Sequence, residues 1–220
     1  MSDIDNQVDY WNRVAWQKEF THSIDLPLLR EWLPLDRRIL DFGCGYGRIC
    51  QELVDAGYRD VVGVDSAAEM IRRGGQRYPE LTLQTLESQG LSYPAESFDA
   101  MLLIAVLTCV PQDRGQTELI ATLTRLLRPG GLLYISDYLL QSDERNQQRY
   151  QQHLTEFGTY GIFRLPEGAV VRHHSRDWME GLTADFERLD ATQVEAVTMN
   201  GPAVRALRYL GRKGPCPGSR

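Results

Sequence analysis

Long apolar runs and a targeting signature are both missing from this 220-residue sequence. No apolar stretch approaches the roughly 20 residues that a membrane-spanning helix needs. The polar start, MSDIDNQVDY, lacks the charged and apolar regions of a signal peptide. We therefore expect a cytoplasmic protein that does not associate with membranes.

Cysteine is also scarce, and its spacing excludes the common metal cages. The four cysteines share neither a CxxC spacing nor histidine neighbours at zinc-site intervals: Cys44, Cys50, Cys109 and Cys216. We expect no metal site, and reduced thiols of the kind found in cytoplasmic proteins.

Basic residues are fewer than acidic residues. Against 24 Lys and Arg stand 30 Asp and Glu, a net charge of −6, and no Lys/Arg-rich run interrupts this balance. Attraction to a phosphate backbone is therefore not expected to drive binding, and we expect no nucleic-acid partner. Arg72, Arg73 and Arg77 on one predicted helix leave RNA open as an alternative, although a solvated helix face explains the same residues.

What the sequence does contain is an alternation of short apolar strands and helices. Strands are expected over residues 39–42, 61–64, 81–85, 100–104 and 132–136, and helices over 48–56, 67–78 and 116–127. Such alternation predicts right-handed βαβ crossovers and a mostly parallel sheet. The segment 128–131, RPGG, is predicted as the turn between the last of these helices and the next strand.

The regions on either side of this core follow other patterns. Before it, a loosely helical spacing of apolar residues predicts an N-terminal helical cap with a break at Pro27. After it come a polar helix over 143–155, a Gly/aromatic stretch over 157–163 and a helix over 176–182. Two strand-like segments, 186–197 and 204–210, are expected to pair as an antiparallel end to the sheet.

A glycine-rich turn is the most informative motif. Residues 39–48 read ILDFGCGYGR, in which Gly43, Gly45 and Gly47 let the backbone turn sharply and let a ligand approach it. The helix that begins there directs its N–H groups and positive dipole end at that ligand. About twenty residues later, Asp65 ends the second predicted strand, where a carboxylate can accept hydrogen bonds from ribose hydroxyls. The combination predicts a nucleoside-binding site.

Two kinds of nucleoside cofactor compete for this geometry. A dinucleotide site needs G-x-G-x-x-G, and its third glycine would fall on the bulky Arg48. The pattern present, three alternating glycines preceded by Asp41, leaves a carboxylate near the turn to meet a cationic amine. We therefore expect a nucleoside that carries an amino acid, and keep a nicotinamide-dependent oxidoreductase as the alternative.

From about Tyr10 to Leu140, the sequence resembles the class I S-adenosylmethionine-dependent methyltransferase family, in particular its bacterial small-molecule members. ILDFGCGYGR resembles the family's first motif, VVGVDS its second-strand acidic motif, LSYPAESFD the approach to strand four and LLRPGG the entry to strand five. The resemblance implies S-adenosylmethionine as cofactor and S-adenosylhomocysteine as product. It also implies an α/β fold: a Rossmann-like, seven-stranded, mostly parallel sheet with one antiparallel C-terminal strand, helices on both faces and an N-terminal helical cap.

On this basis the chain is expected to form one methyltransferase domain, as a monomer or a homodimer. Its expected parts are the helical cap (1–36), the cofactor-binding core (37–140), a substrate-side insertion (141–185), the C-terminal strands (186–211) and a flexible tail (212–220).

The resemblance also implies cofactor contacts. Those around the methionine part and the nucleoside are Gly43, Gly45 and Gly47, with Asp41 near the amine, Asp65 at the ribose, and Ser66 and Met70 beside the adenine. The remaining ones are Glu87 and Ser88 at the adenine amine, the Ala105 carbonyl at the cofactor amine, and Tyr10, Trp11 and Arg48 around the carboxylate. The family usually has Asp where this chain has Glu87. Packing of the first helix is the alternative explanation for the two aromatic residues.

Methyl transfer from a sulfonium needs a nucleophile in line with the methyl group and the exclusion of water. An oxygen or nitrogen acceptor with a proton to lose needs a base as well, and His173, His174 and His22 are the candidates. The His173–His174 pair follows the Gly/aromatic stretch, where the family places substrate-specific elements; a surface pair or a capping contact is the alternative. His22 lies in the N-terminal cap, which could fold over the site.

Aromatic residues define the expected acceptor pocket. Tyr138 ends the fifth predicted strand, and Tyr160 and Phe163 lie in the Gly/aromatic stretch, beyond the strand ends where ligands bind in such sheets. A small satellite core is the alternative for these side chains. The family's amide-methylating signature is missing, since residues 108–111 read TCVP. The expected substrate is a small molecule with an oxygen or nitrogen acceptor; a relative that binds the cofactor but acts only through partners is the alternative.

Overall fold

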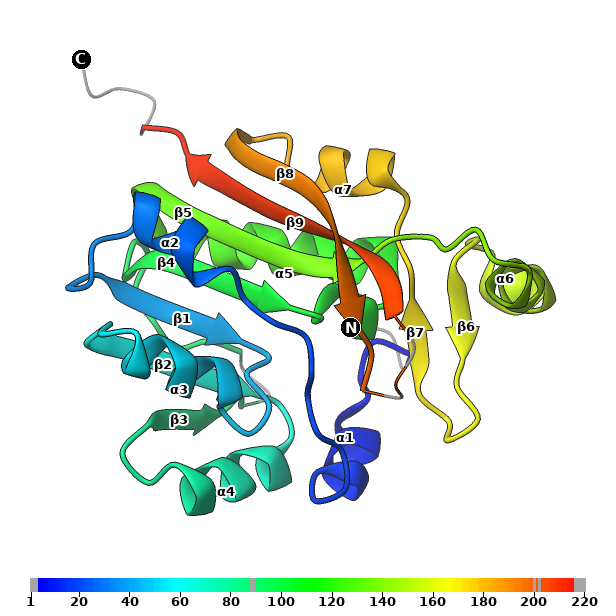
Figure 1. The fold of residues 1–220 in the computed structure, drawn as a ribbon, viewed down its shortest axis with the longest axis horizontal. Helices are drawn as coiled ribbons and strands as arrows, with labels where there is room; N and C mark the ends of the chain where they lie inside the picture. The colour runs from blue at the N-terminus through cyan, green and yellow to red at the C-terminus, as the bar shows by residue number, and fades with distance from the viewer. Residues whose placement is uncertain (1–3, 88–89, 200, 202, 216–220) are drawn as a thin grey trace.

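The computed structural model describes residues 4–87, 90–199, 201 and 203–215 (Figure 1). The strands are β1 (Arg38–Phe42), β2 (Asp60–Asp65), β3 (Thr82–Thr85), β4 (Phe98–Ile104), β5 (Leu127–Tyr138), β6 (Ile162–Arg164), β7 (Val170–Arg172), β8 (Phe186–Val197) and β9 (Ala203–Lys213). The helices are α1 (Val8–Val14), α2 (Leu26–Trp32), α3 (Arg48–Asp55), α4 (Ala68–Arg77), the short 3-10 helix η1 (Leu107–Cys109), α5 (Asp113–Leu126), α6 (Glu144–Phe157) and α7 (Arg176–Leu182).

Most of the strands belong to one twisted sheet. In the described part of the chain this sheet has seven strands in the order β3-β2-β1-β4-β5-β9-β8, while β6 and β7 form a separate hairpin. Strands β1 to β5 are parallel to their neighbours, and β9 runs antiparallel to both β5 and β8. The predicted mostly parallel sheet with one antiparallel strand is confirmed, and so is the pairing of the two C-terminal segments.

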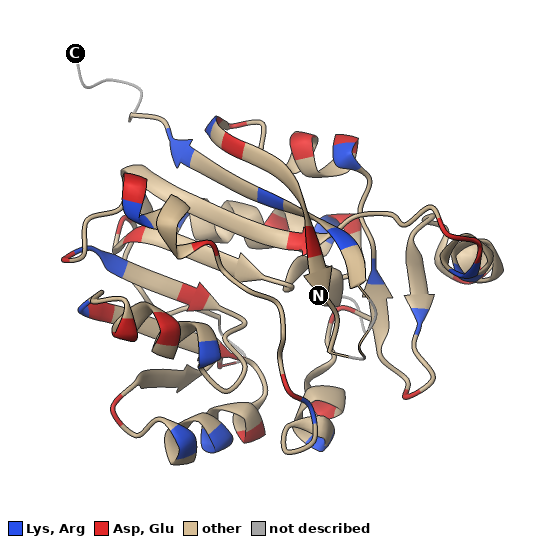
Figure 2. Ribbon diagram, in the orientation of Figure 1, with Lys and Arg blue, Asp and Glu red and all other residues tan. Residues whose placement is uncertain are grey.

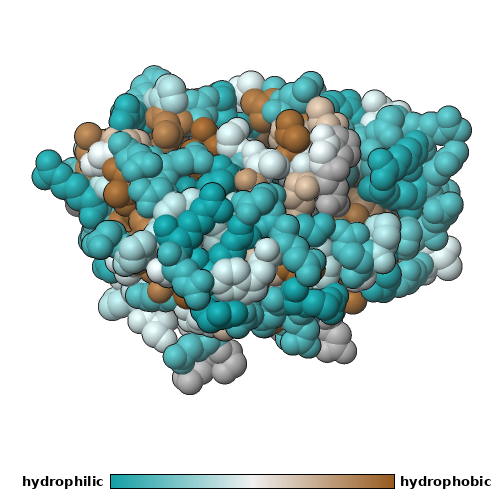
Figure 3. Space-filling view, turned by 60° about the horizontal axis from the view of Figure 1, so that its bottom comes forward, coloured by the Kyte–Doolittle hydropathy of each residue, from teal (hydrophilic) through white to brown (hydrophobic). Residues whose placement is uncertain are grey.

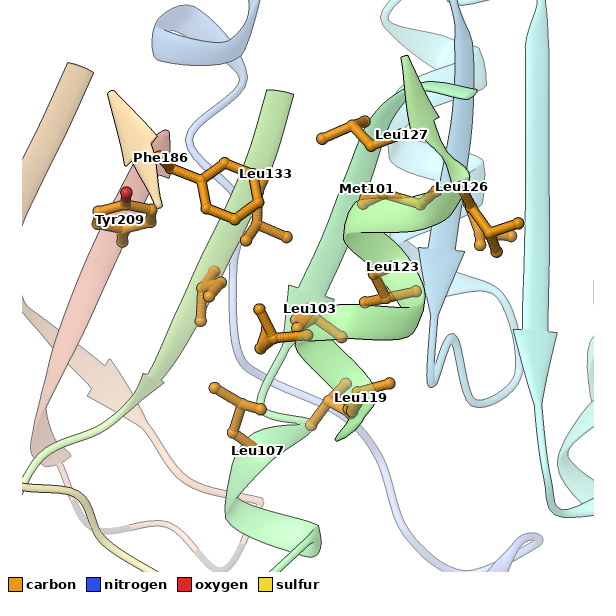
Figure 4. Close-up of a cluster of buried hydrophobic side chains, with 14 of the residues drawn as sticks. Met101, Leu103, Leu107, Leu119, Leu123, Leu126, Leu127, Leu133, Phe186 and Tyr209 are labelled. Carbon is orange, nitrogen blue, oxygen red and sulfur yellow. The ribbon is translucent and has the colours of Figure 1, made fainter. Parts of the chain in front are cut away.

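Helices cover both faces of the sheet because successive residues of a strand point to opposite faces. On one face, Ala100 and Leu102 of β4 pack in a cluster with residues of α2 and α3. On the other, Met101 and Leu103 pack in a cluster with residues of α5 and α7 (Figure 4). Burial of each large apolar side chain contributes about 1.5–3 kcal/mol. The two cores therefore hold the carboxyl ends of the parallel strands at one fixed edge.

The RPGG segment differs from its prediction as a turn. β5 begins at Leu127, and its pairing with β4 shifts register across residues 128–131. The Arg128 side chain donates to the Glu96 carbonyl at 3.1 Å and forms an ion pair with Asp99 at 2.6 Å. These contacts keep the irregular stretch against the end of β4, so the chain joins the sheet without a separate turn.

Pro27 also has a different role from the predicted break. It lies in the first turn of α2, where its missing N–H removes no helical hydrogen bond. The Asp25 carboxylate caps this helix by accepting from the Leu28 N–H at 3.0 Å. The break in the helical cap is instead the segment 15–25 between α1 and α2.

A hairpin follows α6 in place of the irregular Gly/aromatic stretch. The helix ends at Gly158, which adopts the left-handed conformation with φ +71°. Strands β6 and β7 then pair in antiparallel register. The Tyr150 ring of α6 contacts Phe163 of β6 at a centroid distance of 5.7 Å, so the helix packs on the hairpin to one side of the main sheet (Figure 1).

The outer surface is mainly polar. Figure 2 shows both signs of charge interspersed over the helices. Figure 3 shows apolar residues scattered among hydrophilic ones on the face that it presents. In the described ranges, no helix combines the length and the apolar character that crossing a bilayer would require.

Candidate functional site

The glycine-rich turn between β1 and α3 is tied to β2 through its backbone. Gly43 and Cys44 donate their N–H groups to the Val64 carbonyl at 2.8 and 3.0 Å. Gly45 has φ +56°, and a Cβ there would lie 2.0 Å from the Phe20 ring. Backbone strain and steric contact therefore both require glycine at this position.

Asp65 links this turn to the next helix. One carboxylate oxygen accepts from the Gly45 N–H at 2.9 Å, and the other accepts from the Ala67 N–H at 2.8 Å. Each oxygen keeps a lone pair for a ligand. Burial raises the pKa of Asp65, while the two backbone donors act in the opposite direction by favouring the carboxylate.

Asp41 is a second buried acid beside the turn. Burial raises its pKa to about 7, although the Cys50 thiol, which donates to the carboxylate at 3.3 Å, and the charge of Arg48 both lower it. Among the described residues, neither Asp41 nor Asp65 has an ion-pair partner. Asp41 is buried and Asp65 is half-buried, and two such carboxylates without an ion-pair partner favour a cationic ligand at this place.

Both acids face a cavity at the carboxyl edge of the sheet, which we call the turn cavity. Its wall includes the following residues expected to contact the cofactor: Trp11, Asp41, Gly43, Arg48, Asp65, Ser66, Met70 and Ala105. His22 and Tyr138 also belong to the wall. The fold therefore gathers at one edge residues that come from the N-terminal segment and from the ends of four strands.

Four of the expected cofactor residues that the structure describes do not line this cavity, and three of them belong to the turn or to the first helix. Gly45 lies beneath the Phe20 ring. Gly47 is the residue before α3, with φ +81°, and a Cβ there would lie 3.0 Å from Leu83. Tyr10 lines a neighbouring cavity instead. The second and third glycines thus shape the turn and its packing rather than the wall.

The structure does not place Glu87 at the turn cavity. Its side chain is exposed and its backbone bridges to Gly90, whereas the preceding residue, Leu86, lines the wall. The Leu86 N–H donates to the Asp65 carbonyl at 2.8 Å, which fixes the inward side of this segment. In extended chain the next side chain points the opposite way. Ser88, named with Glu87, lies outside the described residues.

Part of the wall was not anticipated from the sequence. It comes from the N-terminal segment: Asp5, Asn6, Gln7, Phe20 and Thr21. The Gln7 amide donates to the carbonyls of Cys109 and Val170 at 3.0 and 2.7 Å and accepts from the Val170 N–H at 2.8 Å. A single glutamine near the start of a chain carries no local signal for contacts with residues so distant in sequence.

A second cavity, which we call the hairpin cavity, adjoins the first. Its wall comes from α6, the β6–β7 hairpin and residues at the facing ends of β8 and β9. The two cavities share five wall residues: Trp11, Ala105, Cys109, Tyr138 and Met199. Molecules bound in the two cavities would therefore meet at these side chains.

Ala105 lies at this junction in a strained backbone conformation. Its φ of +54° is uncommon for a residue other than glycine. The Ala105 N–H donates to the Ser136 carbonyl at 2.8 Å, which fixes the residue between the ends of β4 and β5. Strained residues of this kind concentrate at ligand sites.

The structure places His174 away from both cavities. Its Nδ1 donates to the Tyr138 carbonyl at 3.1 Å, and its Nε2 contacts the Gln116 amide at 2.8 Å. Burial lowers the pKa of His174 to about 3, with the charge of Arg172 acting in the same direction. Both ring nitrogens are engaged inside the core, so neither is available to a substrate.

His22 and His173 each line one of the cavities. In His22, Nε2 bonds with the Ser136 hydroxyl at 2.7 Å, and Nδ1 is buried with no hydrogen-bond partner among the described atoms. In His173, Nδ1 bonds with the Tyr150 hydroxyl at 2.6 Å. Burial lowers the pKa of His22 to about 4 and that of His173 to about 3, so both rings are neutral at neutral pH.

The three aromatic residues expected at the acceptor pocket differ in whether they line a cavity. Tyr138 lines both cavities, and Phe163 lines the hairpin cavity. Tyr160 is 42% exposed and packs against Tyr150 at a ring-centroid distance of 5.1 Å, outside either wall. Of the three, Tyr160 alone therefore lines neither cavity.

Comparison with known proteins identifies the family. Residues 16–186, well over half of the chain, match the family described as methyltransferase domain. The chain belongs to this family. A solved S-adenosylmethionine-dependent methyltransferase from Methanosarcina mazei is similar to it, with a TM-score of 0.80 and 27% identity over 87% of this chain and 100% of that one.

Curated relatives of this methyltransferase act on different kinds of acceptor, according to their names. The eEF1A lysine and N-terminal methyltransferase homologue of Drosophila melanogaster is 25% identical over 61% of this chain, which spans only 22% of that relative's length. The 27-O-demethylrifamycin SV methyltransferase of Amycolatopsis mediterranei is 26% identical over 92% of this chain and 74% of the relative.

The methyltransferase uses S-adenosylmethionine as its cofactor. This cofactor carries positive charge at its sulfonium and at its amine, and the turn cavity presents the buried Asp41 and the half-buried Asp65, neither of which has an ion-pair partner among the described residues. The donor set therefore fits the cofactor. A class I methyltransferase fold and a suitably charged cavity occur together in this chain.

Proposed function

We propose that the methyltransferase transfers a methyl group directly to an oxygen or nitrogen atom of a small molecule held in the hairpin cavity. The observation that carries this proposal is the junction of the two cavities at Ala105, Cys109 and Tyr138. When bound, S-adenosylmethionine supplies a methyl group on a sulfonium, which needs no covalent enzyme intermediate. The protein's task is to hold the acceptor in line and exclude water.

The wall of the turn cavity suggests a role for each cofactor-side residue. We assign the ribose hydroxyls to Asp65, the cofactor amine to Asp41 and the edges of the adenine to Ser66 and Met70. Gly43 allows the methionine part to approach the main chain, since a Cβ there would already lie 2.7 Å from a methyl group of Val106. All five residues lie together at one edge of the sheet.

The N-terminal segment is the part of the chain that we expect to exclude water. Trp11 borders both cavities, and its ring contacts Phe20 at a centroid distance of 6.1 Å. Gln7 fastens the start of this segment to Val170 of the hairpin. With a pKa near 4, His22 is a weak base. The site therefore favours an acceptor that needs no strong base.

The proposal of a small-molecule acceptor rests on how much of each relative's length this chain covers, as well as on the hairpin cavity. The lysine-methylating relative shares only a fifth of its length with this chain, whereas the rifamycin-methylating relative shares most of its own. The hairpin cavity lies between a helix and a hairpin that are part of this chain. Such a space, walled by one helix and one hairpin of the same chain, suits a metabolite better than a long protein side chain on a folded partner.

The test is label transfer from isotopically labelled cofactor. The enzyme is incubated with a metabolite extract of the source cells and, separately, with the protein fraction of the same cells. We expect a labelled methyl group in a small molecule by mass spectrometry. Labelling of protein alone would assign a protein acceptor, and binding of S-adenosylhomocysteine without any transfer would favour an inactive cofactor-binding relative.

A further inference from the structure

The acidic and basic side chains that line the hairpin cavity differ in the partners that they have. Its two acidic side chains have partners: Glu167 pairs with Lys18 at 3.0 Å, and Asp143 accepts from the backbone and side-chain amides of Asn146 at 3.1 and 2.7 Å. Its two basic side chains, Arg145 and Arg149, have no ion-pair partner among the described residues. The donors to Asp143 are neutral, so once the Glu167–Lys18 pair is set aside two guanidinium groups stand against one carboxylate, and the remaining charge of this wall is positive.

The two arginines also stand on the same side of one helix. Arg145 and Arg149 are four residues apart on α6, and both line the cavity. Like charges at this spacing destabilise a helix. Burial lowers the pKa of Arg149, and the charge of Arg145 acts in the same direction, while Asp143 partly offsets it. An anion between the two guanidinium groups would remove this repulsion.

The guanidinium group of Arg149 is oriented by packing so that it can bind such an anion. The side chain is half-buried, and its guanidinium carbon lies 4.4 Å from the centroid of the Phe163 ring. Stacking on an aromatic face orients the planar group and leaves its edge N–H donors free. These donors match the paired oxygens of a carboxylate or phosphate.

His173 adds a neutral donor to the same wall. The Tyr150 hydroxyl accepts from the Gln141 N–H at 3.1 Å, and among the described residues its one other hydrogen-bond contact is Nδ1 of His173 at 2.6 Å. We therefore assign the hydroxyl as the donor to Nδ1, because that nitrogen is the acceptor its proton can reach. The neutral ring then carries its own proton on Nε2. No hydrogen bond within the described residues reaches that Nε2. His173 is thus a donor to a ligand and not a proton acceptor.

We propose that the methyl acceptor is a small organic anion, whose carboxylate or phosphate group binds Arg149 and the Nε2–H of His173 in the hairpin cavity. This inference rests on the proposed function of the same site and specifies its substrate class. It agrees with the low pKa of His22 and His173, the histidines of the two cavity walls, because an acceptor atom that is already an anionic oxygen has no proton for the enzyme to remove.

The first experiment separates metabolites by charge. The extract of the source cells is divided on an anion-exchange column at neutral pH, and each fraction is incubated with enzyme and labelled cofactor. We expect label transfer with the retained, anionic fraction and none with the flow-through. Transfer only with the flow-through overturns the inference and leaves the proposed function intact. Transfer with neither fraction overturns the proposed function, and the inference with it.

Phosphatase treatment of the retained fraction then identifies the anionic group. Acceptor activity that survives the treatment assigns a carboxylate, and activity that is lost assigns a phosphate ester. Both results support an anionic acceptor and distinguish its two sources.

The second experiment tests the arginine. In Arg149→Gln, the amount of anionic fraction needed for half-maximal transfer should rise by about tenfold or more. Arg149→Lys should recover part of this loss because it keeps the charge. Arg164→Gln is the matched control, since this exposed arginine pairs with Glu156 and does not line the cavity.

Cofactor binding separates this effect from misfolding. All three variants should bind S-adenosylhomocysteine within about twofold of wild type by calorimetry, because Arg149 does not line the turn cavity. Half-saturation unchanged in Arg149→Gln would overturn the inference. So would an equal loss in Arg164→Gln.

Discussion

The two adjoining cavities are built in opposite ways. The cofactor side of the turn cavity is shaped by main chain and by two acids, the buried Asp41 and the half-buried Asp65, that lie within one β-α-β unit. The hairpin cavity is shaped by side chains from α6, the β6–β7 hairpin and the ends of β8 and β9, and basic side chains outnumber acidic ones among those without an ion-pair partner. The turn and its two acids depend on short-range geometry, whereas the hairpin cavity depends on packing between distant segments. Changes in the acceptor can therefore be accommodated without disturbing the cofactor.

The difference in charge has a chemical consequence. Carboxylates on one side match a cationic cofactor, and guanidinium groups on the other match the anionic acceptor proposed above. Two ligands of opposite charge would meet at the shared residues around Ala105. Each cavity should then respond to its own substitutions and only weakly to those of its neighbour.

Loss of the Asp65 carboxylate should have the largest effect, confined to the cofactor side. Asp65→Ala removes the proposed ribose contacts and leaves the Gly45 and Ala67 N–H groups without an acceptor. We expect the affinity for S-adenosylhomocysteine to fall by about 100-fold in calorimetry. Asp60→Ala, at the exposed start of the same strand, is the control and should bind normally. Unchanged affinity in Asp65→Ala would remove the basis of the cofactor assignment.

The second-largest expected effect concerns the glycine-rich turn between β1 and α3. In Gly45→Ala, the added methyl group meets the Phe20 ring and the backbone keeps a positive φ, so the free energy of unfolding should fall by about 2–3 kcal/mol in urea titrations. Gly75→Ala is the opposite case, because the helical Gly75 of α4 has open space around it. That variant should gain about 0.5–1 kcal/mol. Equal stability of the two variants would contradict this account of the turn.

A third comparison separates the neighbouring histidines. His174→Ala removes one hydrogen-bond partner of the Gln116 amide, which keeps the Leu107 and Val110 carbonyls, and empties a buried site in the core, so the free energy of unfolding should fall by about 1.5 kcal/mol. Label transfer per folded enzyme should remain normal, because the ring lines neither cavity. His173→Ala should lower label transfer through weaker acceptor binding. Reversal of these two patterns would show that the cavity wall has been assigned to the wrong ring.

Local signals explain which site residues could be predicted from the sequence. Gly43 and Asp65 belong to a turn and a strand end whose roles follow from backbone conformation and sheet topology within about 30 residues. Glu87 shows the limit of this reasoning, because a shift of one residue in extended chain exchanges the inward and outward side chains. The element types of the core were predictable for the same reason as the turn.

Tertiary contacts explain what could not be predicted. Gln7 reaches Val170 and Arg149 stacks on Phe163 only after the hairpin has folded. His173 and His174 are adjacent, so composition and spacing cannot distinguish the ring that faces a cavity from the ring that is enclosed in the core. The residues that line the hairpin cavity could therefore be predicted only in part from the sequence, whereas most of the residues on the cofactor side could be predicted.

The smallest expected effect is a pH dependence that belongs to Asp41. Its pKa near 7 lies above the unfolded value of 3.8, so the folded protein binds more protons in this window and loses stability as pH rises from 3.8 to 7. A ligand ammonium group prefers the ionised carboxylate. Affinity for S-adenosylhomocysteine should therefore increase about fivefold between pH 6 and pH 8.

Calorimetry on the wild type and on Asp41→Asn isolates the contribution of Asp41 to the pH dependence of binding. Asp137 also has a pKa raised by burial to about 7, but its side chain lines neither cavity, so it changes stability with pH without changing ligand affinity. Asp41→Asn should bind S-adenosylhomocysteine more weakly than wild type at pH 8 and with an affinity that no longer varies with pH. A slope that persists in Asp41→Asn would assign the titration to another group, and a wild-type affinity that is flat between pH 6 and pH 8 would separate Asp41 from the cofactor amine.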